Sequence, residues 1–224
     1  MRLIIRVGGS AVASPFNPKL MNDYVELLLN LKQQDHAVAA VIGGGSLSRE
    51  LIKTARAMGL SEPAQDEVAI SVSRVAAQLF VLRLGTHGTL TVPTTIEDAA
   101  KSFKKGKIVV MGGLKPGMTT DSVAAMLAER VNADLLVKAS NVDGIYTKDP
   151  KKHKDAEKLE RLSFNDLRGL FEKEKHEAGI HQVIDPEAVR ILQKNKIKTI
   201  VVDGFKPENV LLAVKGEKVG TLIS

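Results

Sequence analysis

The chain has 224 residues, of which 44% are hydrophobic and 26% are charged, a composition that suits one large globular domain or two closely joined lobes. No continuous apolar run approaches the ~20 residues of a membrane-spanning helix, and the first apolar stretch is too short for a signal peptide. Cysteine is absent, which excludes disulfides and thiolate metal sites and agrees with the cytoplasmic location that we expect.

The net charge of +6 invites a nucleic-acid hypothesis. Aromatic residues, however, make up only 4% of the chain, with no Trp and two Tyr, so few side chains could stack on bases. A basic balance also suits small phosphorylated molecules. We therefore expect small-molecule ligands, without a nucleic-acid or membrane partner.

Strands and helices are predicted to alternate along the whole chain. Apolar runs typical of parallel sheets indicate strands at Arg2–Val7, Ala37–Ile42, Leu90–Val92, Lys107–Met111, Asp134–Val137, Lys198–Val202 and Val219–Ile223. Helical spacing and capping residues indicate helices at Pro18–Leu31, Leu47–Met58, Pro63–Leu84, Ile96–Phe103 and Pro207–Val214, with others beginning near Asp121, Ser163 and Asp185. The polar stretch Lys151–Arg161 is expected to be a loop. This alternation predicts an α/β fold with a mainly parallel central sheet and helices on both faces.

Turns rich in glycine or polar residues follow several of these strands, at 8–10, 43–46, 112–120 and 138–141. Parallel strands end at one edge of their sheet, so these turns are expected to cluster there. Glycines let a phosphate approach the backbone, and a helix N-terminus favours an anion. Several anion sites along one edge predict a polyphosphate or two phosphorylated ligands end to end, which is the geometry of phosphoryl transfer.

The turn from Gly112 to Thr120 nearly matches the P-loop spacing, but Met118 stands where the phosphate-binding lysine should be, so a conventional P-loop is disfavoured. An ordinary strand-to-helix turn, with a threonine as N-cap, explains this segment equally well. Asp121 would repel a phosphate, and it suits an organiser of Mg²⁺ or of a nearby cation.

Three other charged residues have two interpretations each. Arg6 lies near the end of a predicted central strand, where it would face a phosphate or form a structural ion pair. Arg49 lies one turn inside a helix, where it could reach a phosphate or belong to the surface. Asp66 is either a first-turn acid that stabilises its helix or a ligand of a ribose diol.

Taken together, the motifs resemble the amino-acid kinase superfamily and, within it, the UMP (uridylate) kinases of archaeal type. The resemblance covers essentially the whole chain in colinear order. It rests on Gly8-Gly9-Ser10, on Gly43-Gly44-Gly45 with Arg49, on Gly117-x-Thr119-Thr120-Asp121, and on the run Asn141-Val142-Asp143-Gly144-Ile145-Tyr146-Thr147-Lys148-Asp149-Pro150.

This resemblance implies one domain over residues 1–224, a three-layer αβα sandwich with a UMP-binding lobe to about 130 and an ATP-binding lobe from about 131. The implied reaction transfers the γ-phosphoryl group of ATP to UMP with Mg²⁺, in pyrimidine nucleotide biosynthesis, by an enzyme that is a homo-oligomer, commonly a hexamer. Catalytic roles would fall to Arg6 and Asp121. ATP would be bound by Gly9, Ser10, Gly45, Arg49, Ser140, Asn141, Tyr146 and Asp149. UMP would be bound by Gly44, Asp66, Leu114, Lys115, Pro116, Gly117, Met118, Thr119 and Thr120.

The chain departs from the family pattern at two cationic positions. Many members have lysine where Arg6 stands, and a second lysine used by acetylglutamate kinases would fall near the neutral Gln182. Lys138, Lys115 or Mg²⁺ would then carry the missing charge. Asp185 resembles a family position but could equally be a helix cap.

Two rival functions remain open at this point. The chain could be another phosphotransferase of this fold, acting on isopentenyl phosphate or a carboxylate, although the His-Gly-x-Gly segment typical of isopentenyl phosphate kinases is replaced here by Ile42-Gly43-Gly44-Gly45. A non-catalytic nucleotide- or RNA-binding module is the other rival.

Overall fold

The structure, a computed structural model, describes residues 1–148, 150, 152–173 and 183–224. Its centre is a seven-stranded sheet in the order β3-β2-β1-β4-β8-β9-β7. The strands are β1 (Arg2–Val7), β2 (Ala37–Ile42), β3 (Val109–Met111), β4 (Leu135–Ser140), β7 (Arg161–Leu162), β8 (Thr199–Asp203) and β9 (Thr221–Ile223). Neighbouring strands are parallel except β8 and β9. The predicted α/β fold with a mainly parallel sheet is confirmed.

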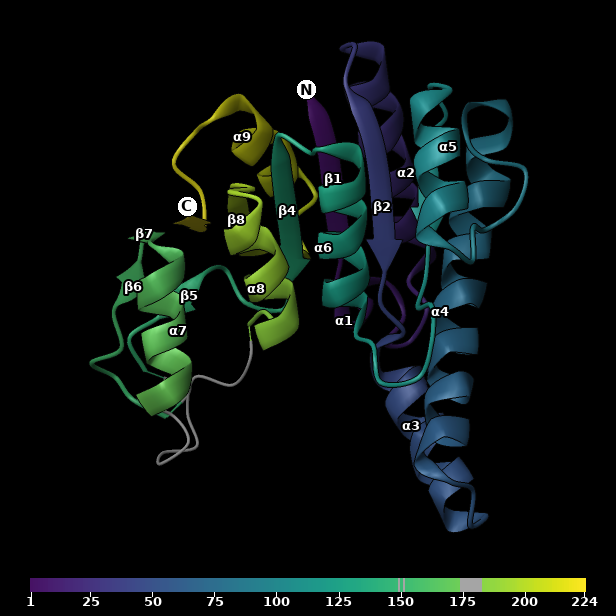
Figure 1. Ribbon diagram of the computed structural model, residues 1–224, viewed down its shortest axis with the longest axis horizontal. Helices are drawn as coiled ribbons and strands as arrows, with labels where there is room; N and C mark the ends of the chain where they lie inside the picture. Colours follow the sequence, from purple (N-terminus) through teal and green to yellow (C-terminus); the bar gives the residue numbers. More distant parts are fainter. Residues whose placement is uncertain (149, 151, 174–182) are drawn as a thin grey trace.

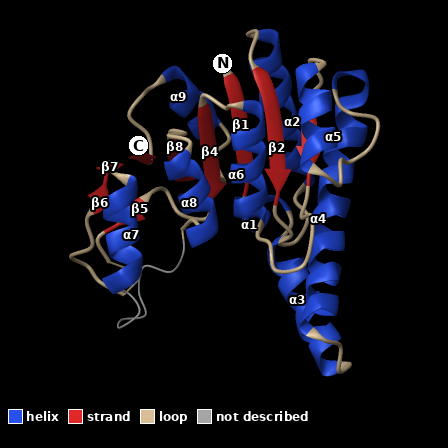
Figure 2. Ribbon diagram, viewed as in Figure 1, coloured by secondary structure: helices blue, strands red, loops and turns tan. Residues whose placement is uncertain are grey.

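Helices cover both faces of the sheet, as Figures 1 and 2 show. They are α1 (Gly9–Val12), α2 (Pro18–Gln33), α3 (Gly45–Ala57), α4 (Glu62–Leu84), α5 (Ile96–Lys104), α6 (Thr120–Val131), α7 (Phe164–Lys173), α8 (Pro186–Lys194) and α9 (Glu208–Lys215). Residues of α2, α4 and α9 pack in one core cluster, and residues of α5, α6 and α8 pack in the other.

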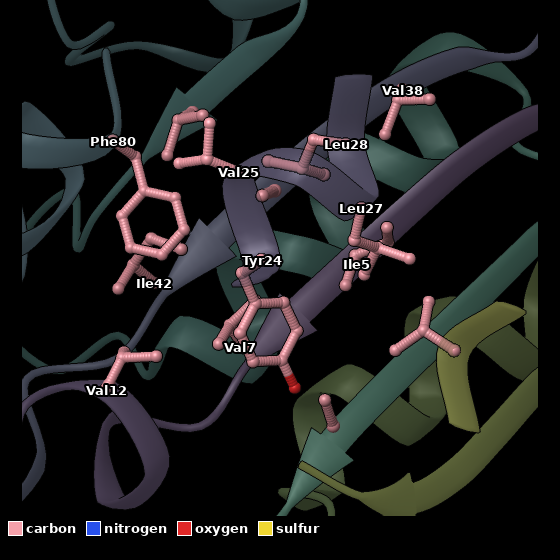
Figure 3. Packing of buried hydrophobic residues seen from close by; sticks show 14 of the residues in the cluster. Ile5, Val7, Val12, Tyr24, Val25, Leu27, Leu28, Val38, Ile42 and Phe80 are labelled. Carbon is pink, nitrogen blue, oxygen red and sulfur yellow. The ribbon is translucent and has the colours of Figure 1, made fainter. Parts of the chain in front are cut away.

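Alternation along the strands decides which side chain faces which helices. On β1, Leu3, Ile5 and Val7 belong to the core under α2, whereas Ile4 belongs to the core under α6. Figure 3 shows the first core, in which the buried Tyr24 lies beside β1. Its hydroxyl donates a hydrogen bond to the backbone oxygen of Gly204 at 2.8 Å, which satisfies its polar end inside the core.

Two predicted elements were wrong. Leu90–Val92 is not a strand: Leu90 is 97% exposed, and the nearby pairing is an isolated bridge between Gly88 and Ile108. The stretch Lys151–Arg161 is not all loop, because β6 (Lys158–Leu159) pairs with β5 (Ile145–Tyr146) in a small antiparallel sheet and β7 begins at Arg161. Short pairings of this kind depend on a partner strand and leave little periodicity of their own.

Helix α4 needs a further correction. Helix α4 and the turn after it, Glu62–His87, have the length and apolar composition of a membrane-spanning helix. No continuous apolar run in the sequence had suggested this. In the structure α4 packs against α3, β2 and β3, and 44% of its most apolar window is buried. This packing accounts for the buried part of its apolar composition.

Candidate active site

Two cations on neighbouring strands share one carboxylate at the carboxyl edge of the sheet. Arg6 on β1 and Lys138 on β4 are paired in the parallel register. Side chains two residues apart on a strand lie on the same face of the sheet. Ile4 and Leu136 belong to the core under α6, so Arg6 and Lys138, two residues further along, also lie on the face covered by α6. Asp121, in the first turn of α6, forms an ion pair through Oδ1 with Arg6 Nε at 2.7 Å and another through Oδ2 with Lys138 Nζ.

These three side chains are largely withdrawn from solvent, at 17% exposed for Arg6, 11% for Asp121 and 6% for Lys138. Burial alone would raise the pKa of Asp121, but the charges of Arg6 and Lys138 outweigh it and lower that pKa. Burial and the like charge of Arg6 lower the pKa of Lys138 to about 8, although Asp121 opposes the shift. At neutral pH the cluster therefore holds two cations and one carboxylate.

The glycine turns after β1 and β2 touch each other through their backbones. A Cβ on Gly9 would lie 2.1 Å from the nitrogen of Gly45, and Gly45 itself has a positive φ of 65°. Side chains at either position would push the two turns apart. Their glycines let the turns meet as one surface beside the Arg6 guanidinium, which lies near Gly8 and Gly43.

All these elements line one cavity of about 260 Å³. Its lining residues come from β1, β4, the glycine turns, α3 and the beginning of α6: Arg6, Gly9, Ser10, Gly43, Gly44, Gly45, Arg49, Thr120, Asp121, Lys138, Ser140, Asn141, Val142 and Val183. The lining thus contains three cations and one carboxylate. Arg6 Nη2 also donates to Thr120 Oγ1 at 3.0 Å, which joins the sheet to the N-terminus of α6. Such a cavity suits anionic phosphates.

The loop before α6 is held by α4. Asp66 Oδ2 accepts a hydrogen bond from the backbone N–H of Gly117 at 2.7 Å. Arg74 donates to the backbone oxygens of Gly113 at 3.0 Å and Leu114 at 2.9 Å. Sequence reasoning missed Arg74, because a helix-to-loop contact between such distant positions leaves no local pattern. Asp66 and the loop, predicted as parts of one binding site, do lie together.

The beginning of α6 is also joined to the beginning of α8. Thr119 caps α6 by accepting from the N–H of Ser122 at 3.1 Å, and its hydroxyl donates to Asp185. Ser122 Oγ donates to Asp185 Oδ1 at 3.0 Å, and that carboxylate caps α8 by accepting from Ala188 N at 2.9 Å. Asp185 is therefore both a helix cap and a bridge between two helix N-termini.

Several predicted site residues lie away from the phosphate cavity. Leu114, Lys115 and Met118 line a second cavity of about 450 Å³ between the loop, α5 and α6. Tyr146 lies on β5, and its hydroxyl donates to Asp143 at 2.9 Å. Asp149 and Gln182 fall outside the described residues. Lys115 is thus separated from the cluster, whereas Lys138 belongs to it.

The described residues also indicate how a metal ion could be held. Among them, no group of three His, Cys, Asp or Glu side chains is arranged to bind one. Both oxygens of Asp121 already face cations. A metal ion here would therefore have to displace one of these cations from Asp121 or take its ligands from a bound anion.

The sequence pattern of the amino acid kinase family matches residues 1–203. The chain belongs to the amino acid kinase family. Among its relatives, a uridylate kinase from Methanocaldococcus jannaschii is 41% identical, with 100% of this chain and 99% of that protein aligned. The crystal structure of a uridylate kinase from Archaeoglobus fulgidus is similar with a TM-score of 0.89 and 38% identity, covering all of both chains. The structure of a UMP kinase from Bacillus anthracis has a TM-score of 0.85 and 25% identity, and covers 100% of this chain and 95% of that one.

Proposed function

We propose that this protein is an ATP-dependent UMP kinase, which transfers the γ-phosphoryl group of ATP to UMP and gives ADP and UDP. The observation that carries this proposal is the convergence of three cations and two glycine turns on one cavity, beside a loop tied to Asp66. Members of the same family that share about 40% identity over their whole length are uridylate kinases.

The two nucleotides meet in this cavity from opposite sides. Residues to about 130 hold UMP, with Asp66 accepting from its ribose hydroxyls and Gly44 approaching its phosphate. The loop Leu114–Thr120 wraps UMP, with its threonines on the α-phosphate. Residues from about 131 hold most of ATP, with Ser140, Asn141, Tyr146 and Asp149 lining its pocket. Gly9, Ser10, Gly45 and Arg49 bind the phosphates between them.

Transfer needs positioning and charge more than acid–base chemistry. An oxygen of the UMP phosphate is already ionised at neutral pH, so no base has to remove a proton from it. Asp121 is ionised and holds its two cations, and this is its role in the site. Arg6 lies between Thr120 and Asp121, where its guanidinium can stabilise charge on the transferred group.

Mg²⁺ brought to the site by the phosphates of ATP would neutralise part of their charge. The protein itself contributes Arg6 and Arg49 to the same task, and its glycine turns supply backbone N–H groups. Removal of divalent ions with EDTA is expected to abolish turnover and to leave the fold intact.

The proposed enzyme is a cytoplasmic homo-oligomer. An exposed apolar face on α4 supports the proposal that it self-associates. Val75, Leu79 and Leu82 form this face. They lie on the helix whose other residues hold the UMP loop.

A comparison of phosphoryl acceptors tests the proposed function. The purified protein is incubated with ATP, Mg²⁺ and one acceptor at a time, UMP, CMP, acetylglutamate or isopentenyl phosphate, and the products are separated by chromatography. We expect UMP to be phosphorylated with by far the highest kcat/KM. Equal turnover of all four acceptors would contradict the substrate assignment, and the absence of any transfer would favour a non-catalytic nucleotide-binding module.

A further inference from the structure

Lys138 is unusual among the charged residues that the structure describes, because it alone is buried, with 4% of its surface exposed. Lysine is almost never buried without a reason, since removing its ammonium group from water is costly. The sequence left Lys138 as one of three candidates for the missing charge, with Lys115 and Mg²⁺, and the strand before it was expected to end at Val137. In the structure β4 continues to Ser140, so Lys138 lies inside the sheet beside Arg6.

A purely structural ion pair does not account for this lysine. Asp121 is shared between Arg6, at 2.7 Å, and Lys138, and with Arg49 the cavity lining holds three cations against this one carboxylate. Like charges directly opposite on neighbouring strands are destabilising. The excess is useful where an anion binds, and Lys138 lines the phosphate cavity.

The position of Lys138 indicates which anion it binds. Arg6 donates a hydrogen bond to Thr120, which lies on the side where the proposed function places UMP. Lys138 lies two residues before Ser140 on β4, on the side where the proposed function places ATP. Asp121 therefore lies between Arg6, on the side of the phosphoryl acceptor, and Lys138, on the side of the phosphoryl donor.

We propose that Lys138 is a second catalytic cation, whose ammonium group binds the donor phosphates and stabilises the charge that develops on the leaving ADP. This inference rests on the proposed function. In the reaction an oxygen of the UMP phosphate forms a bond to the γ-phosphorus while the bond from that phosphorus to the β,γ-bridging oxygen breaks. The bridging oxygen keeps the electron pair and leaves with ADP, so the negative charge grows beside Lys138.

The ionisation of Lys138 agrees with this role. Burial and Arg6 lower its pKa to about 8, so the side chain stays charged at neutral pH, and bound phosphates would hold the proton more firmly. The charged groups that face it are Arg6 on β1, Asp121 on α6 and Asp185 at the start of α8.

The absence of cysteine from the chain permits a selective test. A Lys138→Cys variant carries the sole thiol, which is alkylated in denaturant with 2-bromoethylamine, restoring an ammonium group, or with iodoacetamide, adding a neutral group of similar size. Each product is refolded and checked by circular dichroism. We expect Lys138→Cys to lower kcat about 100-fold, as the loss of one transition-state contact does. Alkylation with 2-bromoethylamine should raise kcat of this variant at least tenfold, and alkylation with iodoacetamide should not.

A matched control uses Lys218→Cys, because the Lys218 side chain is 90% exposed and does not line the cavity. Both reagents should leave its kcat unchanged. A Lys138→Met variant separates catalysis from folding: we expect its melting temperature to equal or exceed that of the wild type while its kcat falls as far as that of Lys138→Cys. A cation kept only for stability would give the opposite result, a lower melting temperature with kcat retained.

The outcomes distinguish this inference from the proposed function. Wild-type turnover of UMP with unchanged kcat in both Lys138 variants would overturn the role of Lys138 alone. Equal rescue by the neutral reagent would also overturn it, since filling space would then suffice. A wild type that transfers no phosphoryl group to UMP would overturn the proposed function and, with it, this inference.

Discussion

Asp66 on α4 accepts a hydrogen bond from the backbone N–H of Gly117 at 2.7 Å, across 51 residues of sequence. This contact uses one carboxylate oxygen, Oδ2, to hold the loop. Arg74, two turns further along the same helix, holds the carbonyl oxygens at the start of that loop. Helix α4 therefore fixes the shape of the segment that the proposed function places around UMP.

Loss of Asp66 should weaken UMP binding specifically. In Asp66→Ala both the loop contact and the proposed ribose contact disappear, and hydrogen bonds to charged groups contribute about 1.5–3 kcal/mol each. We expect KM for UMP to rise by about 10–100-fold and KM for ATP to change little, measured by initial-rate kinetics with each substrate varied in turn. An equal rise in both KM values would contradict the assignment of Asp66 to the acceptor side.

Asp121→Asn tests the carboxylate that holds the two cations. Removing one partner from a buried cluster leaves charge uncompensated, so the free energy of unfolding should fall by about 3 kcal/mol in denaturant titrations at pH 7. The folded-state pKa of Asp121 is lowered, so its contribution is present above the unfolded value near 4 and is lost as the pH falls further. The stability difference between wild type and variant should therefore shrink in acid.

The same variant should respond differently to nucleotides. Without the carboxylate, the phosphates of ATP are the remaining counter-charge for Arg6 and Lys138. We expect ATP to raise the melting temperature of Asp121→Asn more than that of the wild type, although kcat falls at least 100-fold. An Asn variant with wild-type kcat would show that the carboxylate is not needed for transfer.

Asp185 should affect both stability and rate, because it joins α6 to α8. In Asp185→Ala the cap of α8 and the hydroxyl contacts of Thr119 and Ser122 are lost together. We expect a loss of about 2 kcal/mol in unfolding free energy, together with a lower kcat at unchanged KM for ATP. Asn17→Ala removes the cap of α2 and is the control: it should cost about 1 kcal/mol and leave kcat unchanged.

The pH dependence of kcat/KM should report Lys138. Its pKa of about 8 means that the charged form decreases as the pH rises through 8, so kcat/KM for ATP should fall above that value. The Lys138→Arg variant keeps its charge far beyond this range, and its profile should lack this decline. A decline of the same size at the same pH in the arginine variant would assign it to another group.

The exposed face of α4 should control self-association. A charge at its centre, in Leu79→Asp, should shift the protein to a smaller species in light scattering coupled to size exclusion. Phe205→Asp places the same charge on another exposed apolar residue, after β8, and is expected to leave the mass unchanged. A Leu79 variant of wild-type mass would exclude this face as the interface.

The sequence predicted most of the fold because its strands are apolar runs that end in glycine turns. It predicted that these turns would meet, and the structure places Gly9, Gly45 and Thr120 around one cavity. Lys138 could not be placed, because a charged residue after an apolar run looks like the end of the strand. Only the register of β4 against β1 reveals that it lies beside Arg6.

The remaining misses have a similar cause. The strand β6 is two residues long and forms because β5 lies next to it, so it has no signal of its own. The contacts of Arg74 and Asp185 join segments about 40 and 60 residues apart, and single-sequence patterns describe only local structure. The tertiary arrangement, and not the local sequence, decides these contacts.

The proposed function requires one cavity to bring the phosphates of ATP and UMP together. Calorimetric titration with adenosine and uridine joined through five phosphates tests this most directly, because such a molecule spans both sites at once. We expect a Kd at least 100-fold below that of ATP alone, and no further binding of ATP or UMP to the saturated protein. Affinity no greater than that of ATP, with UMP still binding to the saturated protein, would contradict it.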